Sequence, residues 1–172
     1  LRPFVNGVQG TTTTLSSGAA LNFPNLDLLI ATSWESWVST AAFYLSEFRL
    51  VWGSALYTSN FTVPTGPLSA VTNTQVLVKP AAPNISANHS SEAEIVLVGD
   101  AKSSTAQTKY ASASMYFDGN GDAVRVGSTG GTADSYDLDQ FDFSDEPFSI
   151  EFWMRTASPS TYQTALSFIK YN

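Results

Sequence analysis

The feature that most constrains the fold of this chain is the shortness of its apolar runs. Short apolar or alternating stretches recur from end to end, and Gly, Pro, Asn and Ser separate them. No long segment sustains the spacing of an amphipathic helix, whereas short runs between turn residues are typical of strands. The sequence therefore predicts an all-β protein.

The expected strands fall into two groups. In the first part of the chain they are Arg2–Val8, Leu26–Ala31, Phe43–Trp52 and Thr74–Val78, with turns around Asn6-Gly7, Ser17-Gly18 and Pro64–Pro67. In the second part they are Glu94–Val98, Ala113–Phe117, Ala123–Val126, Phe148–Thr156 and Thr164–Tyr171, the last of which also fits a short helix. Between the groups lies KPAAPNISANHSSEAE, whose prolines and small polar residues favour a linker or long loop. We therefore expect two structural parts, residues 1–80 and 94–172, joined by a linker over residues 81–93.

Composition argues against several classes of function. The chain has no cysteine and one histidine, His89, which argues against disulfides, cysteine nucleophiles and zinc sites. A net charge of −7 argues against nucleic acid as a partner, because phosphate contacts need Lys and Arg. No apolar run approaches the ~20 residues that span a bilayer, so membrane insertion is not expected. The charged fraction of only 13% is common in extracellular β-proteins, and a start at Leu1 suggests processing or a longer parent chain.

The stretch YFDGNGDAVRV is similar to the start of a calcium loop. Asp118, Asn120 and Asp122 stand at the alternate positions with which an EF-hand loop begins, but Ala123 and Thr129 replace its turn glycine and its bidentate glutamate. A hairpin turn capped by Asp118 and Asp122 is therefore the first interpretation. A looser calcium site on the same three side chains is the alternative, and calcium is the one cofactor that the sequence suggests.

Acidic residues could serve catalysis, but they lack a suitable arrangement. The segment from Asp134 to Glu151 is acidic without a Lys or Arg, so it either forms a solvated loop or binds a hard cation. Glycoside hydrolysis needs two carboxylates across the scissile bond. In SIEFWMRT, Glu151 is followed at alternate positions by Trp153 and Arg155, so this strand supplies one acid without its partner. We predict no catalytic residues and no enzymatic activity.

Large aromatic residues are concentrated in the first part of the chain, at Trp34, Trp37, Trp52 and Tyr57. Exposed rings stack on the apolar faces of sugars, so these four are the candidate carbohydrate-binding residues. Burial in the core or at a subunit interface is the competing interpretation, because it accounts for most large aromatics.

Two pairs of segments carry a family resemblance. ASASMYFDGNGDAVRV followed by FDFSDEPFSIEFWMRT resembles the opening half of a concanavalin A-like, laminin-G-like jelly roll, through a strand ending in Phe-Asp-Gly and the Phe-x-Ile-Glu-x-Trp pattern at Phe148, Ile150, Glu151 and Trp153. FVNGV and YLSEFRLVWGSALYTSNFTVPTGPL resemble the closing half, with Ser46 where the family often has Asp. The resemblance implies an antiparallel β-sandwich.

The closing half precedes the opening half, which leaves two arrangements. The chain is a window across two tandem jelly rolls, or it is a permuted single domain, since the termini of such domains often lie close together. The first and last residues favour the window. Sequences of this style resemble those of phage tail fibres, other virion appendages and bacterial surface adhesins. We therefore expect a non-enzymatic virion or extracellular module that binds host-surface glycans, or a purely structural subunit that associates with itself or with other virion proteins.

Overall fold

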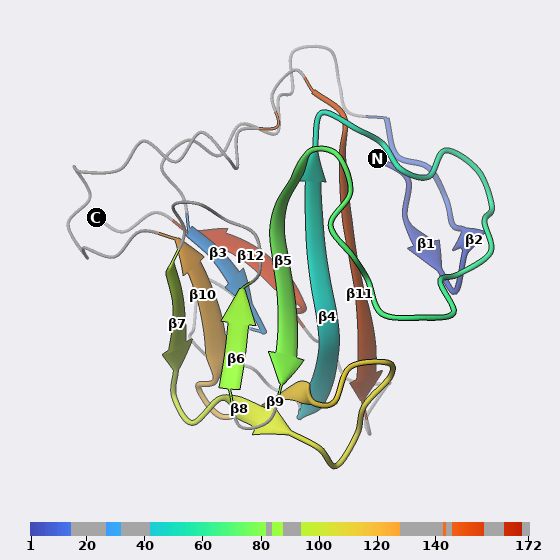
Figure 1. The fold of residues 1–172 in the computed structure, drawn as a ribbon. Coiled ribbons are helices and arrows are strands. Elements are labelled where there is room, and N and C mark those ends of the chain that lie inside the picture. The colour runs from blue at the N-terminus through green and yellow to red at the C-terminus, as the bar shows by residue number, and fades with distance from the viewer. Residues whose placement is uncertain are drawn as a thin grey trace.

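The computed structural model describes residues 1–14, 27–31, 42–81, 84–87, 94–127, 143, 146–156 and 164–169. This part of the chain forms strands and contains no helix, so it also contains no apolar helix long enough to cross a membrane (Figure 1). The strands are β1 (Phe4–Val5), β2 (Val8–Gln9), β3 (Asp27–Ile30), β4 (Phe43–Trp52), β5 (Thr74–Ala81), β6 (Asn84–Ala87), β7 (Glu94–Val98), β8 (Lys102–Ser104), β9 (Ser114–Phe117), β10 (Ala123–Gly127), β11 (Phe148–Thr156) and β12 (Leu166–Ile169). The predicted all-β fold is confirmed.

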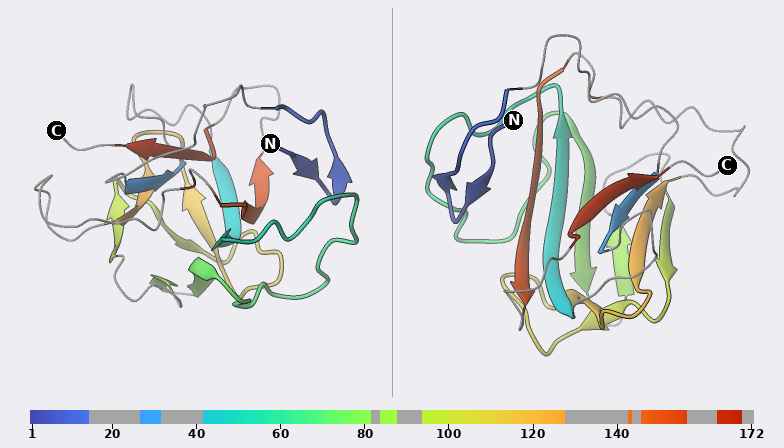
Figure 2. Two further views of the ribbon diagram at one scale, coloured as in Figure 1. Left: turned by 90° about the horizontal axis from the view of Figure 1, so that it is seen from above. Right: turned by 180° about the vertical axis from the view of Figure 1, so that it is seen from behind.

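The strands form an antiparallel β-sandwich and a small hairpin, β1–β2. One sheet has the order β12-β3-β10-β7, and the other has the order β6-β5-β4-β9-β8, with β11 also paired to β4. Strand β4 is central, because β11 pairs with its whole length while β5 pairs with residues 48–51 and β9 with residues 43–45. Figure 2 shows the two sheets facing each other as separate layers.

Side chains from both sheets fill the space between the layers. On β4, Phe43, Leu45, Phe48 and Leu50 are fully or almost fully buried and belong to one core cluster. The opposite sheet contributes to the same cluster with Leu28, Ile30, Val124 and Val126. Removal of such apolar surface from water, worth about 25 cal/mol per Å², is the main force that holds the two layers together.

Both parts of the chain contribute to both sheets. Strand β3 of the first part lies between β10 and β12 of the second, and β4 pairs with β9 and β11 of the second. The core mixes the parts as well, since the ring centroids of Phe43 and Phe117 lie 5.0 Å apart and those of Phe48 and Phe152 lie 6.4 Å apart. One sandwich therefore includes strands of residues 1–80 and of 94–172, as a permuted single domain would.

The strand predictions agree best where the apolar runs are longest. Phe43–Trp52, Glu94–Val98 and Phe148–Thr156 have the predicted bounds. The prediction of one strand over Arg2–Val8 is wrong, because Asn6 and Gly7 adopt φ angles of 50° and 78° and divide it into a hairpin. Strand β6 lies inside the expected linker and pairs with β5, and β8 was not expected at all.

The face of the larger sheet that points away from the core is partly covered. We call residues 53–73 together with the β1–β2 hairpin the cover (Figure 1). Its two pieces are joined, because the Phe61 amide donates to the carbonyl of Gly7 and the Gln9 amide donates to Asn60 Oδ1, each at 2.9 Å. Leu68 of the cover is buried. The opposite end of this outer face stays open and carries the candidate site.

Candidate ligand-binding site

A β-bulge in β4 decides which side chains face outward at the open end. Opposite β11, Phe48 pairs with Phe152 but Ser46 pairs with Trp153, so Glu47 is an extra residue on β4. Glu47 has a φ of 55°, a left-handed conformation that a bulge accommodates. The bulge keeps apolar residues pointing inward on both sides of it and leaves Ser46 on the outer face.

Four strands bring one row of basic and aromatic side chains together on this face. Lys102 of β8 is opposite Tyr116 of β9, Tyr116 is opposite Tyr44 of β4, and Tyr44 is opposite Arg155 of β11. The two tyrosine rings pack with centroids 4.8 Å apart, and the Lys102 ammonium lies 5.7 Å from the Tyr116 centroid. A cation therefore stands at each end of a pair of aromatic rings.

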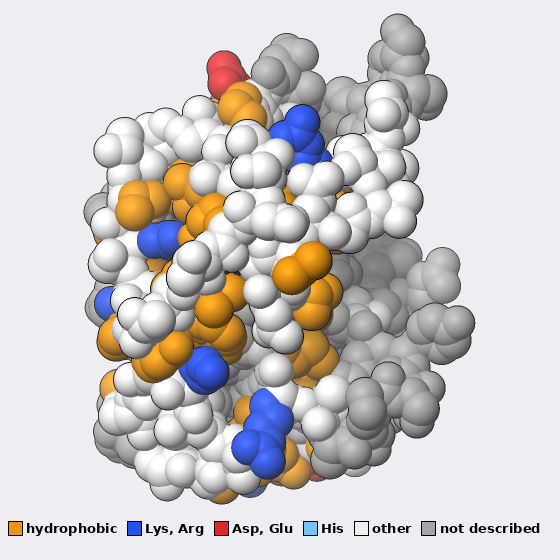
Figure 3. Space-filling view, turned by 90° about the vertical axis from the view of Figure 1, so that its right-hand side faces the viewer, with side chains coloured by type: hydrophobic (Ala, Val, Ile, Leu, Met, Phe, Trp, Pro, Cys, Tyr) orange, Lys and Arg blue, Asp and Glu red, His pale blue; other side chains and the backbone are white. Residues whose placement is uncertain are grey.

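Beside this row the surface forms a hollow of about 330 Å³. The residues that line it are Asn6, Tyr44, Ser46, Gln107, Thr108, Lys109, Ser114, Trp153, Met154 and Arg155. None of these lining residues is acidic. Figure 3, viewed from the side of the hairpin, shows Lys and Arg among hydrophobic side chains, with acidic ones only at the rims of the described surface. A volume at the lower end of the range for ligand sites, which begins near 300 Å³, is enough for one or two sugar rings.

Aromatic rings hold one of the two cations of the hollow in place. The Lys109 ammonium lies 4.9 Å from the ring centroid of Trp153 and 5.3 Å from that of Tyr110. The Tyr110 ring meets Trp153 edge-on, with centroids 5.6 Å apart. The other cation, Arg155, is exposed. Within the part of the chain that the structure describes, neither Lys109 nor Arg155 forms an ion pair.

The buried part of the lining includes a hydroxyl that has no hydrogen-bond partner among the described residues. Ser46 is 4% exposed, and its Oγ makes no hydrogen bond among the described residues. A buried polar group in this state costs about 1–3 kcal/mol. A water molecule or a ligand hydroxyl that forms a hydrogen bond with Ser46 Oγ therefore removes this cost.

Under the cover, the outer face carries a polar network that joins the strands to the cover. Arg49 Nη2 donates to Glu151 Oε2 at 2.8 Å, and Nη1 donates to the carbonyl of Ser69. Burial raises the pKa of Tyr57, and the negative charge of Glu151 raises it further. Arg49 thus joins β4 to β11 and to the cover, although its Nε has no partner among the described residues.

Two acids of the larger sheet, Glu47 and Glu151, lack the arrangement that glycoside hydrolysis needs. Glu151 is engaged by Arg49, and Glu47 is fully buried with its Oε1 accepting from the Leu68 amide at 3.2 Å. Burial raises the pKa of Glu47. Neither acid lines the hollow, whereas glycoside hydrolysis needs two carboxylates that face one open site. The absence of enzymatic activity stays a prediction.

The aromatic residues predicted to bind carbohydrate do not line the hollow where they are described. Trp52 packs against the core, and Tyr57 stacks on Phe61 within the cover, with centroids 3.6 Å apart. Trp34 and Trp37 lie outside the described residues, as does most of the acidic segment after Asp134. Sequence reasoning placed Trp153 and Arg155 on one face by their alternation, but it missed Tyr44, Ser46 and Lys109 as their neighbours.

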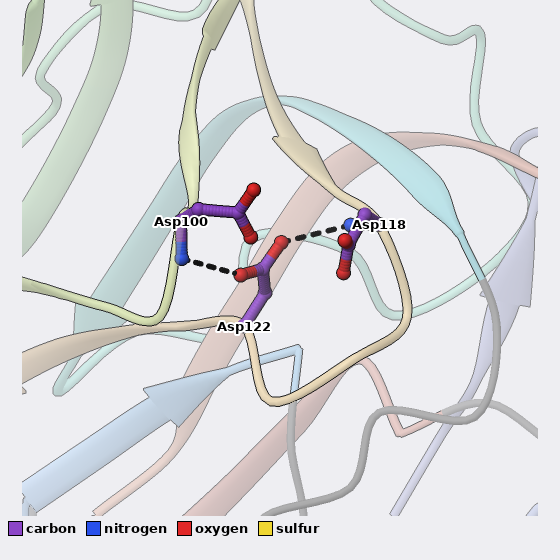
Figure 4. A group of neighbouring side chains, drawn as sticks. All are labelled: Asp100, Asp118 and Asp122. Carbon is purple, nitrogen blue, oxygen red and sulfur yellow. Dashed lines mark hydrogen bonds between the residues drawn. The ribbon is translucent and has the colours of Figure 1, made fainter.

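The acidic residues of the predicted calcium loop lie where the chain crosses between the sheets. Carboxylate oxygens of Asp100, Asp118 and Asp122 lie within 4.8 Å of one another (Figure 4). Asp122 is buried, and its two oxygens accept the amides of Asp100 and Asp118, each at 2.8 Å. Asp118 Oδ1 accepts the amide of Asn120 at 2.7 Å. Asp122 therefore ties the β7–β8 crossing to the β9–β10 crossing.

The hairpin interpretation of this loop is wrong, although its caps are confirmed. Strand β9 belongs to the six-stranded sheet and β10 to the four-stranded sheet, so the two strands do not pair. The positive φ angles, 89° and 77°, lie at Gly119 and Gly121. Burial raises the pKa of Asp122. Carboxylate oxygens are ligands that calcium prefers, and calcium binding by Asp118, Asn120 and Asp122 stays a prediction.

Comparison with known proteins finds no match: no protein-family model, no curated protein and no solved structure matches this chain. Function therefore has to be argued from the site itself.

Proposed function

We propose that this β-sandwich is a non-enzymatic adhesion module that binds a cell-surface glycan in the hollow on its outer face. The sequence resemblance described above suggests a virion fibre or appendage, or a bacterial surface adhesin, as its setting. In such a setting the module attaches the particle or cell to its host.

The observation that carries the proposal is the chemistry of the hollow. Aromatic edges and faces from Tyr44 and Trp153 stand beside polar side chains, and the hydroxyl of Ser46 lacks a partner among the described residues. Ligand sites combine apolar walls with a few placed polar groups, and sugars offer both apolar ring faces and hydroxyls. The hollow matches that combination.

A glycan array with the wild-type protein and two serine variants tests the proposal. Ser46→Val fills the buried part of the hollow and should abolish binding of every glycan that the wild type retains. Ser69→Val is the matched control, because Ser69 is exposed on the cover and outside the lining. Equal binding by Ser46→Val, or no glycan retained by the wild type, would contradict glycan binding in the hollow.

A second candidate function, subunit assembly, is favoured by a separate observation. Leu1, Val5 and Val8 are exposed by 51%, 73% and 61%, and Val5 pairs with Val8 across the hairpin. An exposed apolar pair of this kind suits contact with a second copy of the chain. Sedimentation of wild type against Val5→Ser/Val8→Ser tests it: concentration-dependent dimers that the double variant loses support assembly, and a monomer in both removes it.

A further inference from the structure

We infer that the hollow selects a sugar that carries a negative group, a carboxylate or a sulfate, which Lys109 and Arg155 bind. This inference rests on the proposed function, since it names the class of glycan for the same site. It follows from the positive charge of these two side chains, from the position of Lys109 over the Trp153 ring, and from the lack of ion pairs to either residue within the described part of the chain.

The charge of the hollow is opposite to that of the chain. The chain has 15 acidic residues against 8 Lys and Arg, yet the described residues of the lining include two cations and no acid. Lys102 extends the positive field along the same face. Although the protein is acidic overall, such a local group of cations attracts an anion to the hollow.

The position of Lys109 disfavours a neutral sugar at the most obvious aromatic surface. Its ammonium lies over the Trp153 ring, so a sugar could stack on that face only by displacing it. A carboxylate partner would accept hydrogen bonds from the N–H groups of the ammonium, whereas the cation–π contact leaves these donors unused. A carboxylate or sulfate can accept those donors while the ammonium stays on the ring.

Arg155 supplies the second donor group from a different strand. It lies opposite Tyr44 on the sheet and is free of ion pairs among the described residues. A guanidinium offers a planar fork that matches two oxygens of a carboxylate or sulfate. With Ser46 and Tyr44 in the same lining, the rest of the sugar ring would meet hydroxyl and aromatic groups.

The test compares three sugars that share one ring: D-glucose, D-glucuronic acid and D-glucose 6-sulfate. Binding is followed by NMR through the indole N–H signal of Trp153, at low and at high salt. We expect one or both charged sugars to bind roughly tenfold more tightly than glucose, with the difference shrinking as salt screens the charges.

Variants locate the effect in the hollow. Lys109→Met and Arg155→Met should each remove most of the difference in affinity between the charged sugars and glucose. Lys102→Met is the matched control, since it makes the same charge change on the same face but outside the lining, and it should retain the preference. A preference lost equally in all three variants would overturn the assignment to Lys109 and Arg155.

The failures of the two proposals are distinguishable. Glucose binding as tightly as its charged relatives, with Ser46→Val abolishing both, overturns the charge selectivity and keeps glycan binding. No response to any sugar, here or on the array, overturns both. A peptide with the chain's own sequence DSYDLDQFDFSDE binding more tightly than every sugar would overturn both in favour of an acidic protein segment.

Discussion

On the outer face of β4 and β11, similar residues are paired at one end and lack such partners among the described residues at the other. At the covered end, Arg49 and Ser149 are held by partners from the neighbouring strand and from residues 53–73. At the open end, Arg155 and Ser46 make no ion pair and no hydrogen bond, respectively, among the described residues. The same kinds of side chain on one sheet face therefore serve stability at one end and are free for a ligand at the other.

What separates the two ends is the cover. Where residues 53–73 lie over the sheet, they supply partners to polar groups such as Arg49 Nη1 and Ser149 Oγ, whereas Arg49 Nε and Glu47 Oε2 have none among the described residues. Beyond the edge of the cover, polar groups such as Ser46 and Arg155 can still form hydrogen bonds or ion pairs with a ligand. Substitutions of matched residues at the two ends should accordingly change stability at one end and binding at the other.

The largest contrast is expected between the two arginines. Arg49→Met should lower the free energy of unfolding by about 3 kcal/mol, because it leaves the partly buried Glu151 carboxylate without its partner. Arg155→Met should change it by less than about 0.5 kcal/mol, because Arg155 is exposed and forms no ion pair among the described residues. Urea unfolding of both variants measures the difference. Equal losses would remove the distinction between a structural end and a ligand end.

The contact between the two pieces of the cover, the hairpin and residues 53–73, can be weakened by substituting one glycine. Gly7 has a φ of 78°, and a Cβ placed there would lie 2.1 Å from the carbonyl oxygen of Phe61. Gly7→Ala should therefore cost about 2 kcal/mol and loosen the hairpin from residues 53–73. Gly10→Ala is the control, since its Cβ would come no closer than 3.4 Å to Pro3. Hydrogen exchange of the Phe61 amide should speed up in the first variant only; unchanged exchange in both would mean that the hairpin does not hold residues 53–73.

Buried Glu47 gives the covered end a dependence on pH. Its pKa is raised above the ordinary value of 4.5 by burial, so the folded protein keeps this proton to higher pH than the unfolded chain does. Its contribution is fully present below about pH 4.5 and is lost as pH rises through the raised folded pKa. The difference in unfolding free energy between Glu47→Gln and wild type should therefore shift in favour of the variant over that window. A difference that is flat with pH would show that folding does not raise the pKa of Glu47.

The sequence was sufficient for most of the longer strands but not for the site. Phe43–Trp52 and Phe148–Thr156 were predictable because apolar side chains recur along them, and the alternation of Trp153 and Arg155 put both on one face. Their neighbours could not be predicted. Tyr44 lies opposite Arg155 only because β4 pairs with β11, a strand more than 100 residues away in the sequence. The bulge lies at Glu47, a residue type that does not predict a positive φ angle, whereas a glycine would. The same limit applies to the DGNGD turn, whose caps are local but whose crossing between sheets is not.

The smallest expected difference in stability, between variants of Ser149 at the covered end and of Ser46 at the open end, tests the comparison of the two ends most directly. Ser149 Oγ accepts from the Leu56 amide at 2.8 Å and donates to the carbonyl of Ser54 at 3.2 Å, so Ser149→Ala should cost about 1 kcal/mol. Ser46→Ala removes a buried hydroxyl that has no partner among the described residues, so it should leave the unfolding free energy unchanged or raise it slightly. Thermal unfolding resolves the pair. If Ser46→Ala instead costs as much as Ser149→Ala, its hydroxyl already has a partner, such as an ordered water, and a ligand gains less there. If it costs nothing, that hydroxyl contributes nothing to the stability of the fold and its hydrogen-bonding capacity stays available to a ligand.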